Sequence, residues 1–348
     1  MVTIRDIARA CGVSIATVSN VLNGKKNVSD EMRARVMEKV REMNYTPNSI
    51  AKNLKTKKTR TLGIIVEDIT IFSIPDLVDG ITECCEVNNY RVTLINLRLF
   101  QKFDDVYYHQ EVYREQVQEV LRILLADQVE AIIYIAAHER IIHCLPSNFP
   151  IPLIMCYACT TAPGIPSLLV EETTPTEQLI QYAIDQGHRR IGVITGKRDS
   201  VHSQQRMMAY RQTLIRNDIP YDPSLLCVGD WTRESGIRYT DQLLAQGATA
   251  IFCMNDLMAG GVYARLKELG LTVGKDVGVM GYDNRLLSEY LDPPLTTVAL
   301  PLHELGCRAG EIALEALSAE HAPPPAHIYV AGKVILRGSV QKIEPSPA

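Results

Sequence analysis

The sequence predicts a multidomain protein that combines an all-α helix-turn-helix headpiece with an α/β domain of two doubly wound parallel-sheet lobes. Three observations predict this organisation. Two short helical patterns flank a glycine near the N-terminus, apolar strands alternate with amphipathic helices from residue 61 on, and the same alternation starts again after residue 160. A chain of 348 residues, 46% of them hydrophobic, is long enough for two or three domains.

The first helix is expected to begin after Thr3. Asp6 stands three residues beyond Thr3, which is the spacing of a capping arrangement, and Ile7 and Cys11 belong to an apolar stripe at helical spacing. Gly12 is the kind of residue at which such a helix ends.

The stretch "GVSIATVSNVLNG" predicts a second short helix that begins after Ser14 and ends at Asn23-Gly24. Small hydroxyl and amide side chains at its start suit a recognition helix, which enters the major groove of DNA by its N-terminal end. Candidates for phosphate contacts are Ser14, Thr17 and Ser19, and candidates for base contacts are Ile15, Ala16 and Asn20.

A third helix is expected from Glu31 to Met43, with Ser29 as its cap and an apolar stripe that packs on the first two helices. The three helices make up a headpiece over residues 1–46. Residues 47–60 are predicted to be a hinge helix or linker, because Pro47 breaks the chain and the segment is too short for a stable isolated helix.

Within this hinge, lysines surround the apolar side chain of Leu54. This pattern favours a segment that becomes ordered on DNA and wedges Leu54 between base steps from the minor groove, with Lys52 and Lys55 as further contacts. A flexible basic linker is the alternative.

Positive charge is concentrated in the first part of the chain. Residues 1–60 contain 13 Lys and Arg against 5 Asp and Glu, although the whole chain has a net charge of −4. Phosphate contacts are favoured by counterion release, so this asymmetry indicates that the headpiece alone meets double-stranded DNA.

The rest of the chain is expected to form parallel sheets that are covered by helices on both faces. In such sheets ligands bind beyond the C-terminal ends of the strands. Strands are predicted at residues 61–67, 90–97, 129–136, 151–157, 166–172, 189–195, 248–255 and 277–283, and helices at 74–89, 114–128, 176–188, 205–218, 234–247 and 256–270.

Several functional classes are disfavoured by the sequence. Nine scattered cysteines without a framework predict reduced thiols, and no apolar run suggests a signal segment or a membrane span, so we expect a cytoplasmic protein. We find no phosphate loop, no nucleophile elbow and no convincing metal-ligand spacing, and we therefore expect no catalytic residues, no metal, no cofactor and no enzymatic activity. A solute-binding protein is a further, disfavoured alternative.

The motifs "TIRDIARACGVSIATVSNVLNG", "QGHRRIGVITG", "AIFCMNDLMAGG", "DVGVMGYDN" and "DPPLTTV" resemble the lac repressor/galactose repressor family of bacterial transcription regulators. The resemblance spans residues 3 to 340. It implies a homodimer on a near-palindromic operator and a periplasmic-binding-protein-like domain over 61–341, which binds a small effector between its lobes. It also adds six positions to the candidate DNA contacts, namely Thr3, Asn23, Ser29, Tyr45, Asn48 and Ala51.

The lobes implied by the resemblance cover about 61–160 with 292–322, and about 161–291 with 323–341, followed by a tail at 342–348. The implied effector positions are Arg206, Trp231, Asn255, Asp256 and Asp283, to which we add Ile74 and Tyr157 at positions where this chain departs from the family. An arginine fork, carboxylates and an aromatic face suit a sugar or sugar derivative. A purine-like or sugar-phosphate corepressor is the alternative, although the acidic candidates disfavour a phosphorylated ligand.

Two further departures carry predictions. Asn20 stands where the family usually has arginine, and asparagine favours adenine whereas arginine favours guanine, so we expect an operator altered at that base pair. The segment 100–113 is longer than usual and contains Tyr107, Tyr108 and Tyr113. An effector lid, a dimer-face loop and an ordinary surface loop all remain open for it.

Overall fold

The structure, a computed structural model, describes residues 2–22, 24–25, 28–45, 59–318 and 327–343. The chain divides into two compact units, Met1–Thr59 and Arg60–Ala348. The predicted DNA contacts Asn23, Asn48, Ala51, Lys52, Leu54 and Lys55 lie outside the described residues, as does nearly all of the hinge.

The first unit contains the three predicted helices, α1 (Ile4–Cys11), α2 (Ile15–Leu22) and α3 (Asp30–Glu42). The capping arrangement at the start of α1 is confirmed, because the Asp6 carboxylate accepts hydrogen bonds from the backbone N–H and the hydroxyl of Thr3. Gly12 ends α1 with a φ of 61°, a left-handed conformation that favours glycine. Ile7, Cys11, Val18, Val21 and Val36 are buried between the helices, together with Ala8.

The second unit begins with a lobe built on a parallel six-stranded sheet of order β13-β7-β5-β3-β1-β2. Its first strands and helices are β1 (Thr61–Val66), α5 (Ile74–Val87), β2 (Arg91–Asn96), α6 (Leu99–Phe103), α7 (Val106–His109), α8 (Arg114–Ala126), β3 (Ala131–Ile135), β4 (Ile141–Ile142), β5 (Leu153–Cys156), β6 (Cys159–Thr160) and β7 (Ser167–Glu171). Two later segments, α14 (Leu302–Ser318) and β13 (His327–Ala331), complete the lobe.

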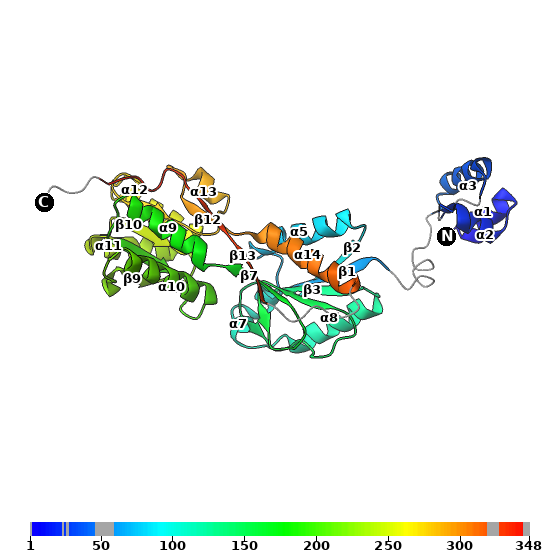
Figure 1. The fold of residues 1–348 in the computed structure, drawn as a ribbon, viewed down its shortest axis with the longest axis horizontal. Coiled ribbons are helices and arrows are strands. Elements are labelled where there is room, and N and C mark those ends of the chain that lie inside the picture. Colours follow the sequence, from blue (N-terminus) through cyan, green and yellow to red (C-terminus); the bar gives the residue numbers. More distant parts are fainter. Residues whose placement is uncertain (1, 23, 26–27, 46–58, 319–326, 344–348) are drawn as a thin grey trace. The chain divides into compact units, whose positions relative to one another are not determined.

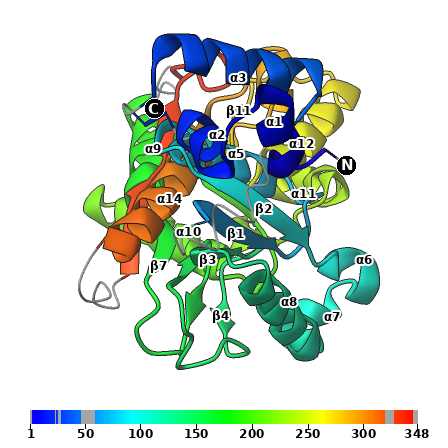
Figure 2. The same ribbon diagram turned by 90° about the vertical axis from the view of Figure 1, so that its right-hand side faces the viewer.

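Helices cover both faces of this sheet (Figures 1 and 2). One apolar cluster packs β1 and β3 against α5 and α14, and a second cluster packs the other face against α8. β1 and β3 are buried along their whole length, which is why their sequences are continuous apolar runs without alternation.

The other lobe contains a parallel four-stranded sheet of order β11-β10-β8-β9 and one continuous apolar core. Its elements are α9 (Thr173–Asp185), β8 (Ile191–Thr195), α10 (Val201–Arg216), the 3-10 turn η1 (Pro223–Leu225), β9 (Leu226–Val228), α11 (Arg233–Ala245), β10 (Ala250–Cys253), α12 (Asp256–Glu268), β11 (Gly278–Met280), α13 (Leu287–Tyr290), β12 (Thr297–Ala299) and β14 (Lys333–Ile335). β12 and β14 pair antiparallel.

The predicted lobe boundaries are wrong at three places. β12 pairs with β14 in the second lobe, and Leu295 and Val298 lie in its core, so residues 292–299 belong to that lobe and not to the first. β7 and β13 pair with each other and β7 pairs with β5, so residues 161–171 and 327–331 belong to the first lobe and not to the second. The chain therefore crosses between the lobes at Glu172, at residues 300–301 and at Gly332. A Cβ at Gly332 would lie 2.6 Å from the carbonyl oxygen of Ala299, which shows how closely two of these crossings pass.

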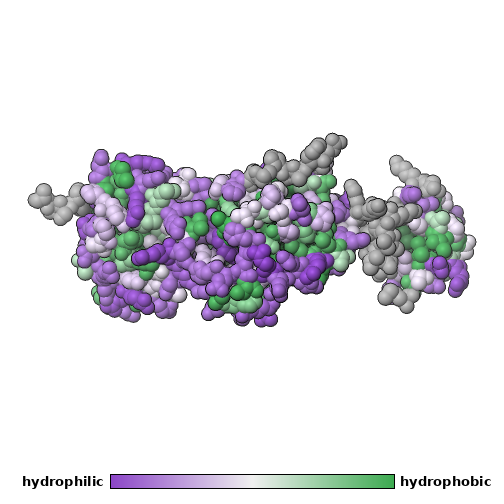
Figure 3. Space-filling view, turned by 90° about the horizontal axis from the view of Figure 1, so that it is seen from below, coloured by the Kyte–Doolittle hydropathy of each residue, from purple (hydrophilic) through white to green (hydrophobic). Residues whose placement is uncertain are grey.

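Apolar side chains are largely confined to the cores. The face of the Arg60–Ala348 unit that is drawn in Figure 3 is mostly hydrophilic and carries several hydrophobic patches. Among the described residues, no helix combines the length and the apolar character needed to cross a membrane.

Candidate functional site

The headpiece exposes the start of α2. Ser14, Ile15 and Ala16 are exposed, whereas Val18 and Val21, further along the helix, are buried. Ile15 keeps 45% of its surface accessible, so it is not part of the apolar core. An exposed apolar side chain at the tip of a recognition helix suits contact with a thymine methyl group.

The hydroxyls at this end of α2 are already ordered by local hydrogen bonds. Ser14 Oγ accepts from the backbone N–H of Thr17 at 3.0 Å and lies 2.9 Å from Thr17 Oγ1. Ser29 caps α3 by accepting from the N–H of Met32, and Tyr45 packs partly buried against the headpiece core. Ser19 and Asn20 are half-buried on the same helix. Their contacts with DNA stay predictions.

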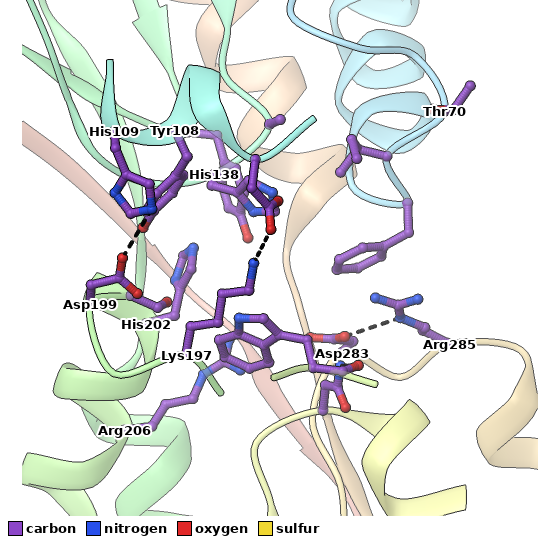
Figure 4. Close-up of a pocket in the computed structure, with 18 residues that line it drawn as sticks. Thr70, Tyr108, His109, His138, Lys197, Asp199, His202, Arg206, Asp283 and Arg285 are labelled. Carbon is purple, nitrogen blue, oxygen red and sulfur yellow. Dashed lines mark hydrogen bonds and ion pairs between the residues drawn. The ribbon is translucent and has the colours of Figure 1, made fainter. Parts of the chain in front are cut away.

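A cavity of about 330 Å³ lies between the two lobes of the Arg60–Ala348 unit (Figure 4). Its walls come from segments that follow β1, β3 and β5 in one lobe and β8, β9, β10 and β11 in the other, which are the C-terminal ends of parallel strands. The lining residues are Thr70, Ile71, Phe72, Asp105, Tyr108, His109, Ala137, His138, Tyr157, Lys197, Asp199, Ser200, His202, Arg206, Trp231, Asn255, Asp283 and Arg285.

Five of the seven predicted effector residues line this cavity, namely Tyr157, Arg206, Trp231, Asn255 and Asp283. Two predictions are wrong. Ile74 is fully buried in the core between α5 and the sheet, and Ile71 and Phe72 form that part of the wall instead. Asp256 is also fully buried and does not line the cavity.

Arg206 does not present a free guanidinium fork to a ligand. Its Nε and Nη2 donate to the two carboxylate oxygens of Glu172, each at 2.9 Å, and Nη1 donates to the carbonyl oxygen of Met254. The guanidinium also lies 3.6 Å from the ring centroid of Tyr282. A ligand can therefore meet only the remaining N–H groups of Arg206.

Glu172 connects Arg206 to a second cavity residue. His202 Nδ1 lies 2.7 Å from Glu172 Oε1, one helical turn before Arg206 on α10. Burial alone would raise the pKa of Glu172, but Arg206 and His202 hold it well below its usual range, so the carboxylate stays charged. The result is a buried, charged network at a crossing between the lobes.

Asp283 and Asp256 form a second polar centre. Asp283 accepts from Arg285 Nε at 3.1 Å, and Asp256 accepts from the backbone N–H of Arg285 and from the hydroxyl of Thr297, each at 2.7 Å. Burial raises the pKa of Asp283 to about 6, and burial together with the charge of Asp283 raises the pKa of Asp256 to about 7. These two carboxyl groups therefore hold a proton close to neutral pH.

Aromatic side chains form the apolar walls. Trp231 follows β9 with a φ of 73°, and the Asn255 amide donates to its carbonyl oxygen at 2.9 Å. Its indole ring lies against Gly196, where an added Cβ would be 1.9 Å from Trp231 Cζ2. Glycine at position 196 is therefore required for the present position of the indole.

Replacing Gly196 with alanine is expected to push the Trp231 ring into the cavity and to reduce ligand binding at least tenfold, a cost of about 1.4 kcal/mol. Trp231 is the only tryptophan in the chain, so its fluorescence reports the displacement directly. Gly260→Ala is the matched control, because a Cβ there meets only Leu287 Cδ2, at 3.4 Å. An unchanged emission maximum in Gly196→Ala would contradict this prediction.

The Tyr-rich segment contributes to the cavity. α7 supplies Tyr108 and His109, with Asp105 just before it, while Tyr107 and Tyr113 are buried beneath them. This placement makes the segment a part of the cavity wall.

A buried ion pair anchors this segment. Arg140 donates to both carboxylate oxygens of Glu67 and to the hydroxyl of Tyr113, and its guanidinium lies within 6 Å of the ring centroids of Tyr107, Tyr108 and Tyr113. Such cation–π packing fixes α7 on the lobe.

Charges on the cavity walls are paired across the lobes and within them. Lys197 Nζ lies 2.5 Å from Asp105 Oδ2, and His109 Nε2 lies 3.5 Å from Asp199 Oδ2, so α7 is joined to the loop after β8 (Figure 4). Burial lowers the pKa of His138 to about 4, which leaves it uncharged at neutral pH. Lys197, Arg206 and Arg285, the lysine and arginine side chains that line the cavity in the described part of the chain, therefore each lie beside a carboxylate.

Several lining residues were not predicted from the sequence. His202 could have been found, because it stands four residues before Arg206 and hence on the same face of one helix. Lys197, Asp199 and Arg285 lie in loops just after strand ends, and His138 follows β3. These residues follow predicted strands, and this position is the signal that could have identified them. Their residue types alone do not distinguish a position in the cavity from a position on the surface.

Comparison with known proteins identifies the family. Residues 3–48 match the model of bacterial regulatory proteins of the lacI family, and residues 180–340 match that of a periplasmic binding protein-like domain. The ribose operon repressor of Haemophilus influenzae is 32% identical over 317 residues, covering 90% of this chain and 92% of that protein. The HTH-type transcriptional repressor PurR of Vibrio parahaemolyticus is 29% identical and covers 99% of this chain and 100% of its own.

Among solved structures, the lac repressor dimer bound to operator and the anti-inducer ONPF is 25% identical, with a TM-score of 0.78 and coverage of 98% of this chain and 99% of that chain. Both the helix-turn-helix headpiece and the two-lobed α/β domain are thus found in the same order in a known repressor. The chain belongs to the lacI family of bacterial regulatory proteins.

Proposed function

We propose that this protein is a cytoplasmic, homodimeric transcriptional repressor whose affinity for operator DNA is set by an uncharged, sugar-like effector in the interlobe cavity. The observation that carries the proposal is the pairing of charges in that cavity. Lys197, Arg206 and Arg285 each face a carboxylate, so a phosphorylated ligand would find no unpaired lysine or arginine among the described residues that line the cavity. Hydroxyl groups on an apolar ring match the remaining amide, carboxylate and aromatic groups.

The relatives support an effector-controlled regulator of this kind. One is named for the ribose operon, another is named PurR, and the lac repressor structure holds an anti-inducer together with operator DNA. The aromatic residues Phe72, Tyr157 and Trp231 cover the apolar face of a sugar ring in our proposal. A purine base is the alternative occupant that the binding experiment distinguishes.

Ligand binding is tested by thermal unfolding and by the fluorescence of Trp231. The probes are D-ribose, D-glucose and cellobiose, compared with hypoxanthine, guanine and glucose 6-phosphate. A bound ligand at about 100 times its dissociation constant adds about 2.7 kcal/mol to the free energy of unfolding. We expect a neutral sugar to produce this shift, and a shift with purines or sugar phosphates alone would overturn the proposed ligand class.

DNA binding is tested on duplexes selected from a random pool. We expect near-palindromic sites, because a twofold symmetric dimer presents two copies of α2. Operator affinity should fall steeply with salt, and the sugar that stabilises the protein should change that affinity. Equal affinity for all duplexes, with and without that sugar, would contradict the proposed repressor.

Asn20→Arg is expected to change the preferred base at one position of each half-site from adenine to guanine. A bidentate side-chain contact discriminates between bases by about 1–3 kcal/mol, so the matched duplexes should exchange their order of affinity. Binding of the variant to duplexes that differ only at that base pair measures the effect. Asn44→Arg, at an exposed position after α3, is the control for added positive charge and should leave the base preference unchanged.

A further inference from the structure

Helices α5 and α14 approach each other unusually closely on the first lobe. A Cβ at Gly80 would lie 2.1 Å from the carbonyl oxygen of His303, and a Cβ at Gly306 would lie 2.2 Å from that of Leu77. Only glycine permits this backbone contact. The side chains next to these glycines are therefore held at short range across the two helices.

Each helix contributes two metal-binding side chains one turn apart. Asp79 and Glu83 are four residues apart on α5, and His303 and Cys307 are four residues apart on α14. His303 Nε2 lies 3.0 Å from Glu83 Oε2 and 3.5 Å from Asp79 Oδ2, and His303 Nδ1 lies 3.7 Å from Cys307 Sγ. One donor atom each from Glu83, His303 and Cys307 lies within 4.8 Å of the others.

We propose that Glu83, His303 and Cys307 form a surface binding site for a zinc-like divalent cation, with Asp79 within reach as a fourth ligand. Thiolate, imidazole and carboxylate are the ligand types that Zn²⁺ prefers in tetrahedral sites. Ligand bonds of about 2.0–2.3 Å place donor atoms somewhat closer together than they are here, and rotation of exposed side chains supplies this adjustment. A rigid helix pair makes the site largely pre-formed.

Negatively charged side chains around His303 and Cys307 favour the binding of a cation. The carboxylates of Asp79 and Glu83 lie beside His303, and Glu311 stands four residues after Cys307 on α14. A divalent cation compensates these negative charges and takes the place of the thiol proton, which is released to solvent on binding. His303 Nε2 would give up its contacts with Asp79 and Glu83, whose carboxylates are then free to bind the metal.

The test is a titration of the full-length, reduced and chelator-treated protein with Co²⁺, followed by displacement with Zn²⁺. We expect one cobalt per chain, a thiolate-to-cobalt charge-transfer band in the near ultraviolet, and loss of the band when Zn²⁺ is added. Cys307→Ser should abolish the band, and His303→Gln should weaken cobalt binding by about tenfold or more.

Matched controls keep the result specific to this cluster. Cys159 is the other cysteine that is not fully buried, and His327 is an exposed histidine on β13, so Cys159→Ser and His327→Gln should leave the titration unchanged. Operator binding and thermal unfolding of each variant without metal verify that it is folded. The proposal is overturned if cobalt binds without a thiolate band, if the band survives in Cys307→Ser, or if no metal binds. Because metal binding is measured without effector or DNA, its failure leaves the proposed regulatory function untouched.

Discussion

Replacing Arg206 with methionine is expected to lower the free energy of unfolding of the two-lobed unit by about 3–5 kcal/mol, because the change leaves the buried carboxylate of Glu172 without its bidentate partner. Both side chains are almost completely inaccessible to solvent. His202 Nδ1 remains in contact with the Glu172 carboxylate in this variant. Denaturant unfolding, monitored by circular dichroism, measures the loss.

Two comparisons separate this effect from the loss of any arginine. Arg216 lies on the same helix and pairs with Glu177 at the surface, so Arg216→Met should change the stability little. The double variant Glu172→Gln with Arg206→Met removes both charges and should recover part of the lost stability. A double variant no more stable than Arg206→Met would show that packing, and not the unpaired charge, dominates.

Asp256→Asn is expected to stabilise the protein above neutral pH and to flatten its stability profile between about pH 4 and pH 7. The folded-state pKa of Asp256 is raised from its ordinary value of 3.8 to about 7, so the folded protein holds a proton that the unfolded chain has lost. The stabilisation from that proton is fully present below about pH 4 and disappears as the pH rises through 7. The amide of asparagine mimics the protonated carboxyl, since it can accept from Arg285 N–H and donate to the Thr297 hydroxyl.

Unfolding free energies of the wild type and of Asp256→Asn across this pH range measure the effect. Asp241→Asn serves as a control, because hydrogen bonds from Arg265 lower the pKa of the exposed Asp241 and its contribution changes only at more acidic pH. The prediction would be contradicted if the unfolding free energies of the wild type and of Asp256→Asn changed with pH in the same way.

The helices of the headpiece and the strands of the lobes were predictable because their signals are local. A threonine with an acidic residue three positions later, a glycine with positive φ and continuous apolar runs each act within a few residues. The assignment of β7 and β13 to a lobe was not predictable in this way. Short apolar strands have the same sequence pattern in either sheet. Which sheet such a strand joins depends on where the chain crosses between the lobes.

The location of the cavity was predictable, but much of its chemistry was not. Glu171 and Glu172 are adjacent in sequence, yet Glu171 accepts from the backbone N–H groups of Thr173 and Thr174 while Glu172 pairs with Arg206. The sequence around Glu171 and Glu172 does not distinguish their roles, because Arg206, the partner of Glu172, lies 34 residues away. α7 has only four residues, too few for a periodic signal, and its position depends on the distant Arg140.

The order of the strands has a consequence for biosynthesis. α14 covers one face of the first sheet and β13 forms its edge, yet both are encoded near the end of the chain. A nascent polypeptide that has emerged from the ribosome only as far as residue 300 therefore exposes Leu62, Ile64 and the apolar side of α5 to the cell. The headpiece has its own core and can fold early, whereas the first lobe cannot be completed before α14 and β13 have been synthesised, and its apolar surface stays exposed until then.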